Sequence, residues 1–508
     1  MMNFTGKNSV VGLMLLVCVT SCRTADEFKK ETVDYVKLEK SYLEVATVAD
    51  GLHVPWGIDY FDGKLIFTEI TGKVKQLDLE TGNVSILLVL DEVFQKRTTG
   101  LLDIAVQQTT DANPFVVLNY TAEEDSMIVS NLVRYTYTGD TLLDPKKLLV
   151  AKGYTGHNGA RVIIDKGDII YWATGDVADN TQAQDSTTCN GKILRLQLDG
   201  SIPADNPIPD SYVYAWGFRN IQGLTLGGQG NLFTSEHGDA IEDEINRIQP
   251  LHNYGWPQIE GMHDTPEELA IVENHRRTEP IKSWTPVIAP AGLAYYNHSG
   301  IPEWQNTLLL VTLKSQTLRV LLLNEDHTAI TGEKTYFSDR YGRIRDVLVA
   351  PNGDVYLATS NQDWNPQPGF PLDTDDRILR IRKTPDIPDA EAYVEADVYE
   401  DTNALDGAAI YKNYCASCHK DDGMGVANSF PPLKGSRSIN NTAAFIDILL
   451  NGTDGQQRIN GVTYDQPMAS FSFLEDEELS AIINYVNTAF GSGRLILTKE
   501  VTNQRQRE

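Results

Sequence analysis

Two cysteines and a histidine near the end of the chain have the spacing of a covalent cofactor-attachment site. The run Cys415-Ala416-Ser417-Cys418-His419 has the C-x-x-C-H pattern to which a c-type haem is attached. The two thiols would bond to the porphyrin, and the histidine would be an axial iron ligand. A structural zinc site would need further cysteine or histidine ligands nearby, and a redox dithiol would need a βαβ context; the surrounding sequence has neither. This end of the protein is therefore predicted to carry electrons.

The second axial ligand of the iron is expected to be a soft donor, usually methionine. Two methionines lie in this region, and Met424 follows His419 too closely to reach around the haem. Met468 is therefore the predicted ligand. The alternative is that Met468 is an ordinary packing residue.

Helices are predicted on both sides of this site. Apolar residues recur at helical spacing over residues 406–414 and 476–490, and the second helix opens with acidic residues that suit the positive end of a helix dipole. A Pro-Pro-Leu run begins at Pro431, in the loop expected beneath the haem. With these features, residues 405–492 resemble a class I cytochrome c, which implies a small all-α domain.

The beginning of the chain predicts export. Residues 10–19 form an apolar run that fits a signal-peptide core and is shorter than the roughly 20 residues needed to span a bilayer. The run ends in Val-Thr-Ser-Cys22, which resembles the lipobox of bacterial lipoproteins. We expect a lipoprotein signal peptide at 1–21 and lipidation of Cys22, which would anchor the protein in the bacterial cell envelope, periplasmic or outer-membrane associated. The alternative is an ordinary cleaved signal in which Cys22 is incidental.

The charge of the chain excludes one class of partner. Its 43 basic and 70 acidic residues give a formal net charge of −27. Binding to nucleic acid depends on neutralising phosphates with basic side chains, and no basic cluster offsets the acidic surplus here. We therefore expect no nucleic-acid partner.

The middle of the chain contains a repeat. Apolar runs rich in β-forming residues follow glycine or asparagine turns about every 50 residues. They begin at Lys64, Phe115, Asp168, Asn231, Thr307 and Asp354. Six such units predict an all-β six-bladed β-propeller at 46–384; a pair of β-sandwiches is the alternative. The remaining segments are predicted to be a tether at 22–45, a linker at 385–404 and a C-terminal tail at 493–508.

Polar residues that follow the apolar runs are expected at one rim of the propeller, where such folds carry functional groups. His157 precedes the third repeat, and Asp176 ends its apolar run. The basic residues of the expected rim are Arg219, Lys314, Arg343 and Arg345. Cations gathered on one ring of so acidic a protein predict a site for an anionic molecule.

Four short sequences around this rim carry a family resemblance. GFRNIQG, SEHGD, DEIN and NYGWP begin at Gly217, Ser235, Asp243 and Asn253. In combination they make residues 46–384 resemble the soluble glucose dehydrogenase and aldose sugar dehydrogenase family, whose propellers bind pyrroloquinoline quinone (PQQ). The resemblance implies that PQQ, a tricarboxylate, is held by Arg219, Asn220, Lys314, Arg343 and Arg345, with Gln222 near the substrate.

The resemblance also implies calcium, a hard cation that prefers oxygen ligands. One ion would lie on the quinone, bound by the backbone carbonyls of Gly238 and Asp239. A second, structural ion would use the Glu244 carboxylate and the Tyr254 carbonyl. The chain departs from the family at Ile221 and Asp239, where members often have proline. Asp239 keeps its carbonyl and adds a negative charge beside the expected metal.

The implied reaction is oxidation of a sugar at its anomeric carbon. His157 is the expected base and Asp176 the group that orients it, while Arg219 would stabilise charge developing on the quinone. Electrons would pass to the haem and then to a downstream carrier or terminal oxidase. The alternatives are a non-catalytic propeller that binds a sugar or protein and carries a haem relay, and a calcium-dependent lactone hydrolase.

Overall fold

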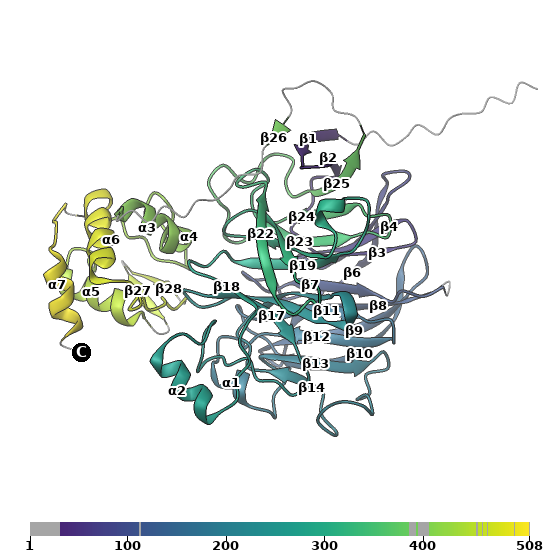
Figure 1. Cartoon of the computed structure of the whole chain (residues 1–508), viewed down its shortest axis with the longest axis horizontal. Coiled ribbons are helices and arrows are strands. Elements are labelled where there is room, and N and C mark those ends of the chain that lie inside the picture. The colour runs from purple at the N-terminus through teal and green to yellow at the C-terminus, as the bar shows by residue number, and fades with distance from the viewer. Residues whose placement is uncertain are drawn as a thin grey trace, which may run out of the picture.

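A six-bladed β-propeller and a smaller helical lobe make up the protein (Figure 1). The computed structural model describes residues 31–110, 113–385, 393–394, 406–453, 456–459, 461–464, 466–491 and 493–506. The predicted signal peptide, Cys22 and most of the predicted linker lie outside these residues. None of the helices in the described ranges is long and apolar enough to cross a membrane.

Each of the first five blades is an antiparallel sheet of four strands that follow one another in the chain. The first blade consists of β3 (Pro55–Phe61), β4 (Lys64–Glu69), β5 (Lys73–Asp78) and β6 (Val84–Val89). The second consists of β7 (Leu101–Val106), β8 (Phe115–Glu124), β9 (Met127–Tyr137) and β10 (Leu142–Lys152). The third blade consists of β11 (Gly159–Ile164), β12 (Ile169–Thr174), β13 (Lys192–Gln197) and β14 (Val213–Trp216). The fourth consists of β15 (Ile221–Leu226), β16 (Leu232–Glu236), β17 (Asp243–Ile248) and β18 (Lys282–Trp284). The fifth is β19 (Pro290–Tyr296), β20 (Thr307–Thr312), β21 (Leu318–Leu323) and β22 (Ile330–Tyr336).

The sixth blade joins the two ends of the propeller sequence. Its inner strands are β23 (Ile344–Val349), β24 (Val355–Thr359) and β25 (Ile378–Thr384), and its next strand is β2 (Tyr42–Ala49), which pairs antiparallel with β25. The strand β1 (Glu31–Lys37) pairs with β2 and with the short β26 (Tyr393–Val394). Residues 31–37 and 42–45 of the segment expected to be a tether therefore belong to this sheet, in which β2 covers the edge of β25 that would otherwise be unpaired.

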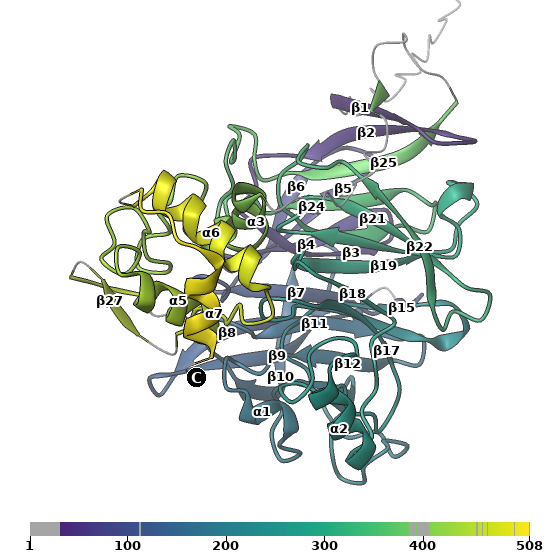
Figure 2. The same ribbon diagram turned by 60° about the vertical axis from the view of Figure 1, so that its left-hand side comes forward.

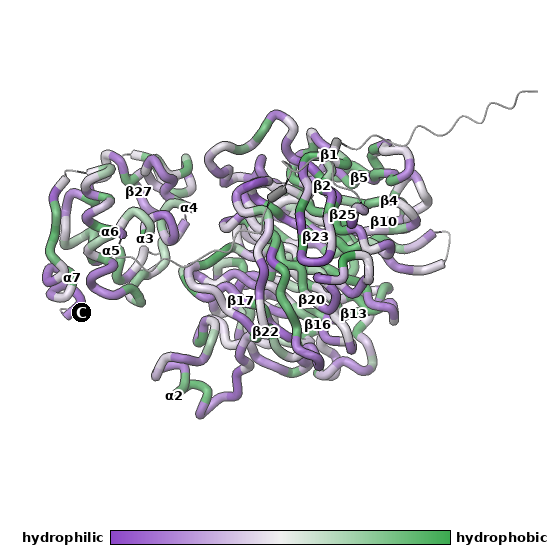
Figure 3. Tube along the Cα trace, turned by 45° about the horizontal axis from the view of Figure 1, so that its top comes forward, coloured by the Kyte–Doolittle hydropathy of each residue, from purple (hydrophilic) through white to green (hydrophobic). Residues whose placement is uncertain are grey.

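The repeated apolar runs are the second strands of the six blades, namely β4, β8, β12, β16, β20 and β24. They are almost entirely buried because neighbouring blades cover both of their faces. Figure 3 shows the hydrophobic residues concentrated along strands such as β16 and β20. The six-bladed propeller predicted from the runs is confirmed.

Buried aspartates join the innermost strands of neighbouring blades. Asp103 accepts a hydrogen bond from Val162 N (2.8 Å), and Asp346 accepts one from Ile58 N (2.9 Å). Both carboxylates also pair with Arg161, at 3.2 and 2.8 Å. These contacts hold the blades around the central channel, where a cavity of about 350 Å³ lies.

The helical lobe is the predicted cytochrome-like region. It contains α3 (Gly407–Tyr414), α4 (Ala416–His419), α5 (Thr442–Asn451), α6 (Asp476–Ala489) and α7 (Thr498–Arg505), with a hairpin of β27 (Gln457–Ile459) and β28 (Val462–Tyr464). Ile496 and Val501 are buried in its core, so the segment expected to be a tail packs on the lobe through α7. Figure 2 shows the lobe beside the propeller. Four short helices lie in propeller loops: α1 (Thr181–Gln184), α2 (Pro266–Asn274), η1 (Gly228–Gly230) and η2 (Pro302–Trp304).

Because β2 completes the sixth blade, truncating the Leu43 side chain should strongly destabilise the fold. This β2 side chain is fully buried in the core shared by blades five and six. Leu43→Ala should lower the free energy of unfolding by about 2–5 kcal/mol, as expected for a buried leucine that leaves a cavity. Val89→Ala, a truncation on an exposed edge strand, is the control. Chemical denaturation measures both, and equal midpoints for the two variants would contradict the role of β2.

Candidate active site and haem site

His157 and Asp176 form a hydrogen-bonded pair at the rim. His157 Nδ1 lies 2.9 Å from Asp176 Oδ1, and the buried aspartate also accepts hydrogen bonds from Ala178 N and Trp256 Nε1, both at 2.8 Å. Burial alone would raise the pKa of the Asp176 carboxyl, but the hydrogen bond from His157 and the charge of Arg219 lower that pKa below its usual value. An ionised carboxylate only accepts hydrogen bonds, so in the neutral imidazole of His157 the proton lies on Nδ1 and the lone pair on Nε2.

The backbone around this pair is specific to glycine. A Cβ atom at Gly175, between β12 and Asp176, would lie 2.1 Å from the carbonyl oxygen of His157. His157 itself has a left-handed φ of 50°, an uncommon conformation that often marks functional loops. Its side chain is 27% exposed, which leaves the ring open to a substrate.

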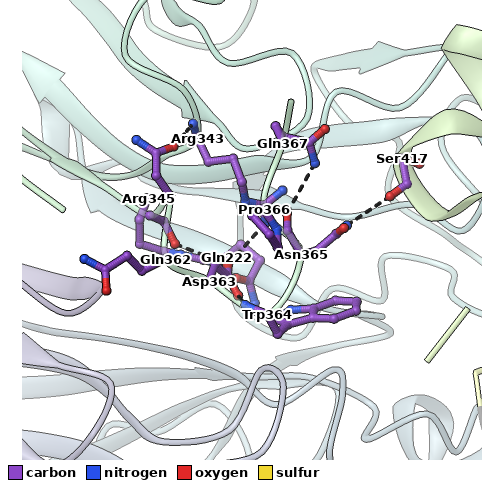
Figure 4. A network of polar contacts seen from close by, with 12 residues as sticks. Gln222, Arg343, Arg345, Gln362, Asp363, Trp364, Asn365, Pro366, Gln367 and Ser417 are labelled. Atoms are coloured by element: carbon purple, nitrogen blue, oxygen red, sulfur yellow. Dashed lines mark hydrogen bonds and ion pairs between the residues drawn. The ribbon is translucent and has the colours of Figure 1, made fainter. Parts of the chain in front are cut away.

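Arg343, just before β23, and Arg345, the second residue of β23, are buried against a single carboxylate. Arg343 Nη2 lies 3.1 Å and Arg345 Nη2 lies 2.7 Å from Asp363 Oδ2. Figure 4 shows the three side chains together. Arg343 is 8% exposed, Arg345 7% and Asp363 2%. Burial lowers the pKa of Arg345 to about 10. Burial would raise the pKa of Asp363, but the two guanidinium groups lower it below its usual value. The cluster carries one positive charge in excess, and an anionic ligand would neutralise it.

Arg219 contacts the loop in which calcium is expected. Its Nη1 donates to Gly238 O (2.7 Å), and its Nη2 pairs with Asp239 Oδ1 (2.6 Å). The guanidinium lies 5.3 Å from the centre of the Trp256 ring. Asp239 therefore gives Arg219 a carboxylate partner that a proline at this position would not provide.

The two amides implied as cofactor and substrate contacts lie beside the arginine pair. Asn220 Oδ1 accepts hydrogen bonds from Gly159 N (3.2 Å) and from Gln222 Nε2 (3.1 Å). Gln222 Oε1 accepts one from Arg345 Nη1 at 3.2 Å. The structure thus brings together His157, Asp176, Arg219, Asn220, Gln222, Arg343 and Arg345 at one end of the channel.

Lys314, the remaining predicted cation, lies at the edge of this group. It follows β20, and its ammonium group donates to the carbonyl oxygen of Asn413 in the helical lobe. Burial lowers the pKa of Lys314. Its ammonium can still donate two further hydrogen bonds towards the rim.

The residues implied for calcium are oxygen-rich. Glu244 accepts hydrogen bonds from Gly261 N and Asn246 Nδ2, both at 2.7 Å, and burial raises its pKa to about 7. The buried ring of Tyr254 stacks on Phe218, with ring centres 4.7 Å apart. No group of three or more His, Cys, Asp or Glu side chains in the described ranges has a metal-binding arrangement.

The haem-attachment residues have contacts that fit a c-type haem. Cys415 and Cys418 are both free thiols, at the end of α3 and in α4. His419 Nδ1 lies 2.9 Å from the carbonyl oxygen of Pro431, which orients the ring and leaves Nε2 for iron. Burial lowers the pKa of His419, more than the Pro431 contact raises it, so the ring is neutral and able to bind metal.

Met468 and Met424 lie in different environments. Met468 is partly buried against the core of the lobe, and its backbone pairs with Thr453. Met424 is 54% exposed. The assignment of Met468 as axial ligand remains a prediction.

The segment that carries the haem cysteines, residues 415–420 including the short helix α4 and called below the haem-attachment loop, faces the propeller rim. Asn365 Nδ2 donates to Ser417 O (3.1 Å), and Lys420 Nζ donates to Asn365 Oδ1 and to Pro366 O, the latter at 3.1 Å. The rings of Trp364 and Phe430 lie 5.6 Å apart. Further contacts come from Arg97, which donates to Asn428 O and Ser429 Oγ, and from Lys314. The lobe therefore lies over the end of the channel at which the arginines gather.

The residues present fit an anionic cofactor in the propeller and haem in the lobe. The Nε atoms of Arg219, Arg343 and Arg345 are buried and have no hydrogen-bond partner within the described ranges. Unpaired buried donors are costly, and several around one end of the channel fit a ligand with several acceptors. Fold and site together define a redox propeller with an attached electron-transfer domain.

Comparison with known proteins identifies the same two domains. Residues 52–365 match the family model Glucose / Sorbosone dehydrogenase, and residues 404–490 match the Cytochrome c model. The chain belongs to the glucose/sorbosone dehydrogenase family of PQQ-dependent propeller enzymes, and it carries a C-terminal cytochrome c domain.

Individual relatives cover one or the other domain. An aldose sugar dehydrogenase of Escherichia coli is 29% identical over 62% of this chain and 90% of its own length. The PQQ-bound aldose sugar dehydrogenase of Streptomyces coelicolor is 30% identical, with a TM-score of 0.58 over 67% of this chain and 98% of that one. Cytochrome c-552 of Thermus thermophilus is 38% identical over 18% of this chain and 72% of its own length.

Sequence reasoning missed several residues that the structure places in or beside the site. Trp256 holds Asp176, Asp363 pairs with both arginines, and Asn365 and Lys420 join the domains. Asp363 follows a second strand of a blade, as Asp176 does, so the rule that selected Asp176 would also have found it. Lys420 and Asn365 have no such signal.

Replacing Asp363 should destabilise the cofactor-free protein. Asp363→Asn leaves two buried guanidinium groups without a counter-charge, and breaking a buried pair in this way costs about 3–5 kcal/mol. The folded-state pKa of Asp363 is lowered, so its contribution is complete above the unfolded pKa and is lost as pH falls through the folded value. Chemical denaturation at neutral and acid pH should show that the loss of stability caused by Asp363→Asn is smaller in acid. Asp205→Asn, which changes an exposed carboxylate paired with Arg195, should alter stability little at either pH; equal losses for both variants would contradict the assignment.

Removing Met468 should alter the haem. Methionine ligation raises the potential of cytochrome c iron, so Met468→Ala should lower the haem potential and slow haem reoxidation. Spectroelectrochemical titration measures the potential, and Met424→Ala is the matched control. An unchanged potential and spectrum in Met468→Ala would remove Met468 from the ligand set.

Proposed function

We propose that the protein is an exported, lipid-anchored dehydrogenase that oxidises the anomeric hydroxyl of an aldose to a lactone. It passes the electrons to its own haem c and then to a downstream carrier or terminal oxidase. The observation that carries the proposal is the set of buried guanidinium groups with unpaired Nε atoms at the end of the channel that also holds the His157–Asp176 pair. Export and anchoring at Cys22 rest on the amino-terminal sequence alone.

The chain's own residues have separate tasks in this reaction. His157 Nε2 takes the proton of the anomeric hydroxyl, while Asp176 keeps the proton on Nδ1 and fixes the ring. Arg343 and Arg345, with Asn220 and Lys314, bind the carboxylates of PQQ. When bound, PQQ supplies the acceptor for the hydride.

Two further groups complete the proposed pocket. Arg219 would stabilise negative charge that develops on the cofactor, and Gln222 would contact the sugar. Calcium bound by Gly238 and Asp239 would act as a Lewis acid there; a second ion at Glu244 and Tyr254 would be structural.

The electron count explains the second domain. Oxidation of one aldose to the lactone releases two electrons and two protons, whereas one haem iron accepts one electron as Fe(III) becomes Fe(II). Two transfers to the haem are needed for each sugar, and the first electron must leave for a downstream carrier before the second arrives. The haem-attachment loop over the rim supports this route.

Reconstitution tests the function. The haem-containing, PQQ-free protein is mixed with PQQ and calcium, and aldoses are screened with an artificial dye as electron acceptor. The wild type should reduce the dye, and His157→Ala should do so ~10²–10⁴-fold more slowly because it lacks the base. PQQ binding, measured by equilibrium dialysis, should be retained in the variant.

The other outcomes separate the alternatives. A wild type that binds no PQQ would favour the non-catalytic propeller, and calcium-dependent lactone hydrolysis without PQQ would favour the hydrolase. A near-normal rate in His157→Ala would remove His157 from the role of base.

A further inference from the structure

One short segment of the sixth blade contacts both the cofactor pocket and the haem-attachment loop. Asp363 pairs with Arg343 and Arg345, and Asn365, two residues later, donates to the carbonyl oxygen of Ser417 (Figure 4). Ser417 lies between the two haem cysteines in the sequence. The pocket and the haem site are thus joined through three consecutive propeller residues, 363–365.

The conformation of this segment is fixed by its own hydrogen bonds. The Asp363 carboxylate accepts hydrogen bonds from Ser360 Oγ (3.2 Å) and from Trp364 N (2.6 Å), in addition to the two arginines. Gln367 Nε2 donates to Asn365 O at 3.3 Å. A carboxylate with four partners holds the chain rigidly, so the position of Asn365 is set by the arginine pair.

The cytochrome side meets this segment with complementary groups. The Lys420 ammonium donates to Asn365 Oδ1 and to Pro366 O. The Asn365 amide therefore accepts a hydrogen bond from Lys420 and donates one to Ser417 O. The ring of Phe430 also packs on Trp364. Lys420 directly follows His419, the predicted iron ligand, so these contacts lie next to the haem site.

We propose that the segment Asp363–Asn365 positions the cytochrome domain for electron transfer, by holding the haem-attachment loop at a fixed distance from the arginines of the cofactor pocket. The proposal rests on the proposed function and adds to it the docking surface and its residues. The rate of a reaction between two bound groups depends steeply on how closely they are held. Asn365 and Lys420 are therefore positioning residues, which touch neither the sugar nor the cofactor.

The test compares variants that lose the interface contacts with one that keeps them. Asn365→Ala and Lys420→Met remove the polar contacts, and Lys420→Arg keeps a donor for Pro366 O. Lys412→Met is the matched control, because Lys412 is an exposed lysine of α3 for which no hydrogen bond to the propeller occurs within the described ranges. All variants are prepared as the full chain with haem attached.

Two measurements are made on these variants. With PQQ and calcium bound, stopped-flow absorption follows haem reduction after mixing with an aldose, and dye reduction reports sugar oxidation without the haem. Without PQQ, small-angle X-ray scattering reports whether the cytochrome domain stays against the propeller. Haem potentials are measured alongside, to separate positioning from a change in driving force.

We expect haem reduction to be about 10-fold slower in Asn365→Ala and in Lys420→Met, the effect on docking of losing a hydrogen bond to a charged group. Dye reduction and the haem potential should not change, and the PQQ-free variants should scatter as more extended particles. Lys420→Arg and Lys412→Met should behave as the wild type.

The proposal is overturned if both loss variants reduce haem as fast as Lys412→Met. A wild type that oxidises no aldose with PQQ and calcium would instead overturn the proposed function. In that case the scattering decides the docking claim: more extended loss variants support it, and unchanged profiles refute it.

Discussion

The arrangement of the rim follows from two guanidinium groups buried against one carboxylate. Arg343 and Arg345 share Asp363 in a buried site, which leaves a positive charge without a partner. A folded protein tolerates such an excess where a ligand supplies the missing charge, because unpaired buried ions are costly. The same electrostatic requirement explains why unpaired donors of Arg219, Arg343 and Arg345 lie near each other and why an anionic cofactor fits between them.

The His157–Asp176 pair shows how the fold produces chemistry from ordinary groups. The carboxylate is buried but remains ionised, because His157, Arg219 and Trp256 surround it. Its charge fixes the tautomer of the histidine and leaves the basic nitrogen at the partly exposed edge of the ring. The propeller contributes rigidity: residues from several blades meet only because aspartates such as Asp103 and Asp346 join neighbouring inner strands.

The position of the cytochrome domain is the second consequence of the rim geometry. Lys314, Trp364 and Asn365 all follow strands of the fifth and sixth blades, at the same end of the channel as the arginines, and all contact the helical lobe. One set of loops thus serves both the cofactor pocket and the domain interface. A separate electron-carrier protein would have to find this surface by diffusion, whereas here the covalent connection keeps it at high effective concentration.

The sequence by itself determined the features that depend on local spacing: the haem motif, the six apolar runs with their rim residues, and the helices that became α3 and α6. Each can be predicted because residues close together in the chain form a motif or repeat with the period of a strand or a helix. Only the tertiary structure decided that β1 and β2 complete the last blade, that Trp256 holds Asp176, and that Asn365 and Lys420 join the two domains. These pairings connect residues far apart in the chain, and their free energy depends on burial and proximity that exist only after folding, so no local pattern records them.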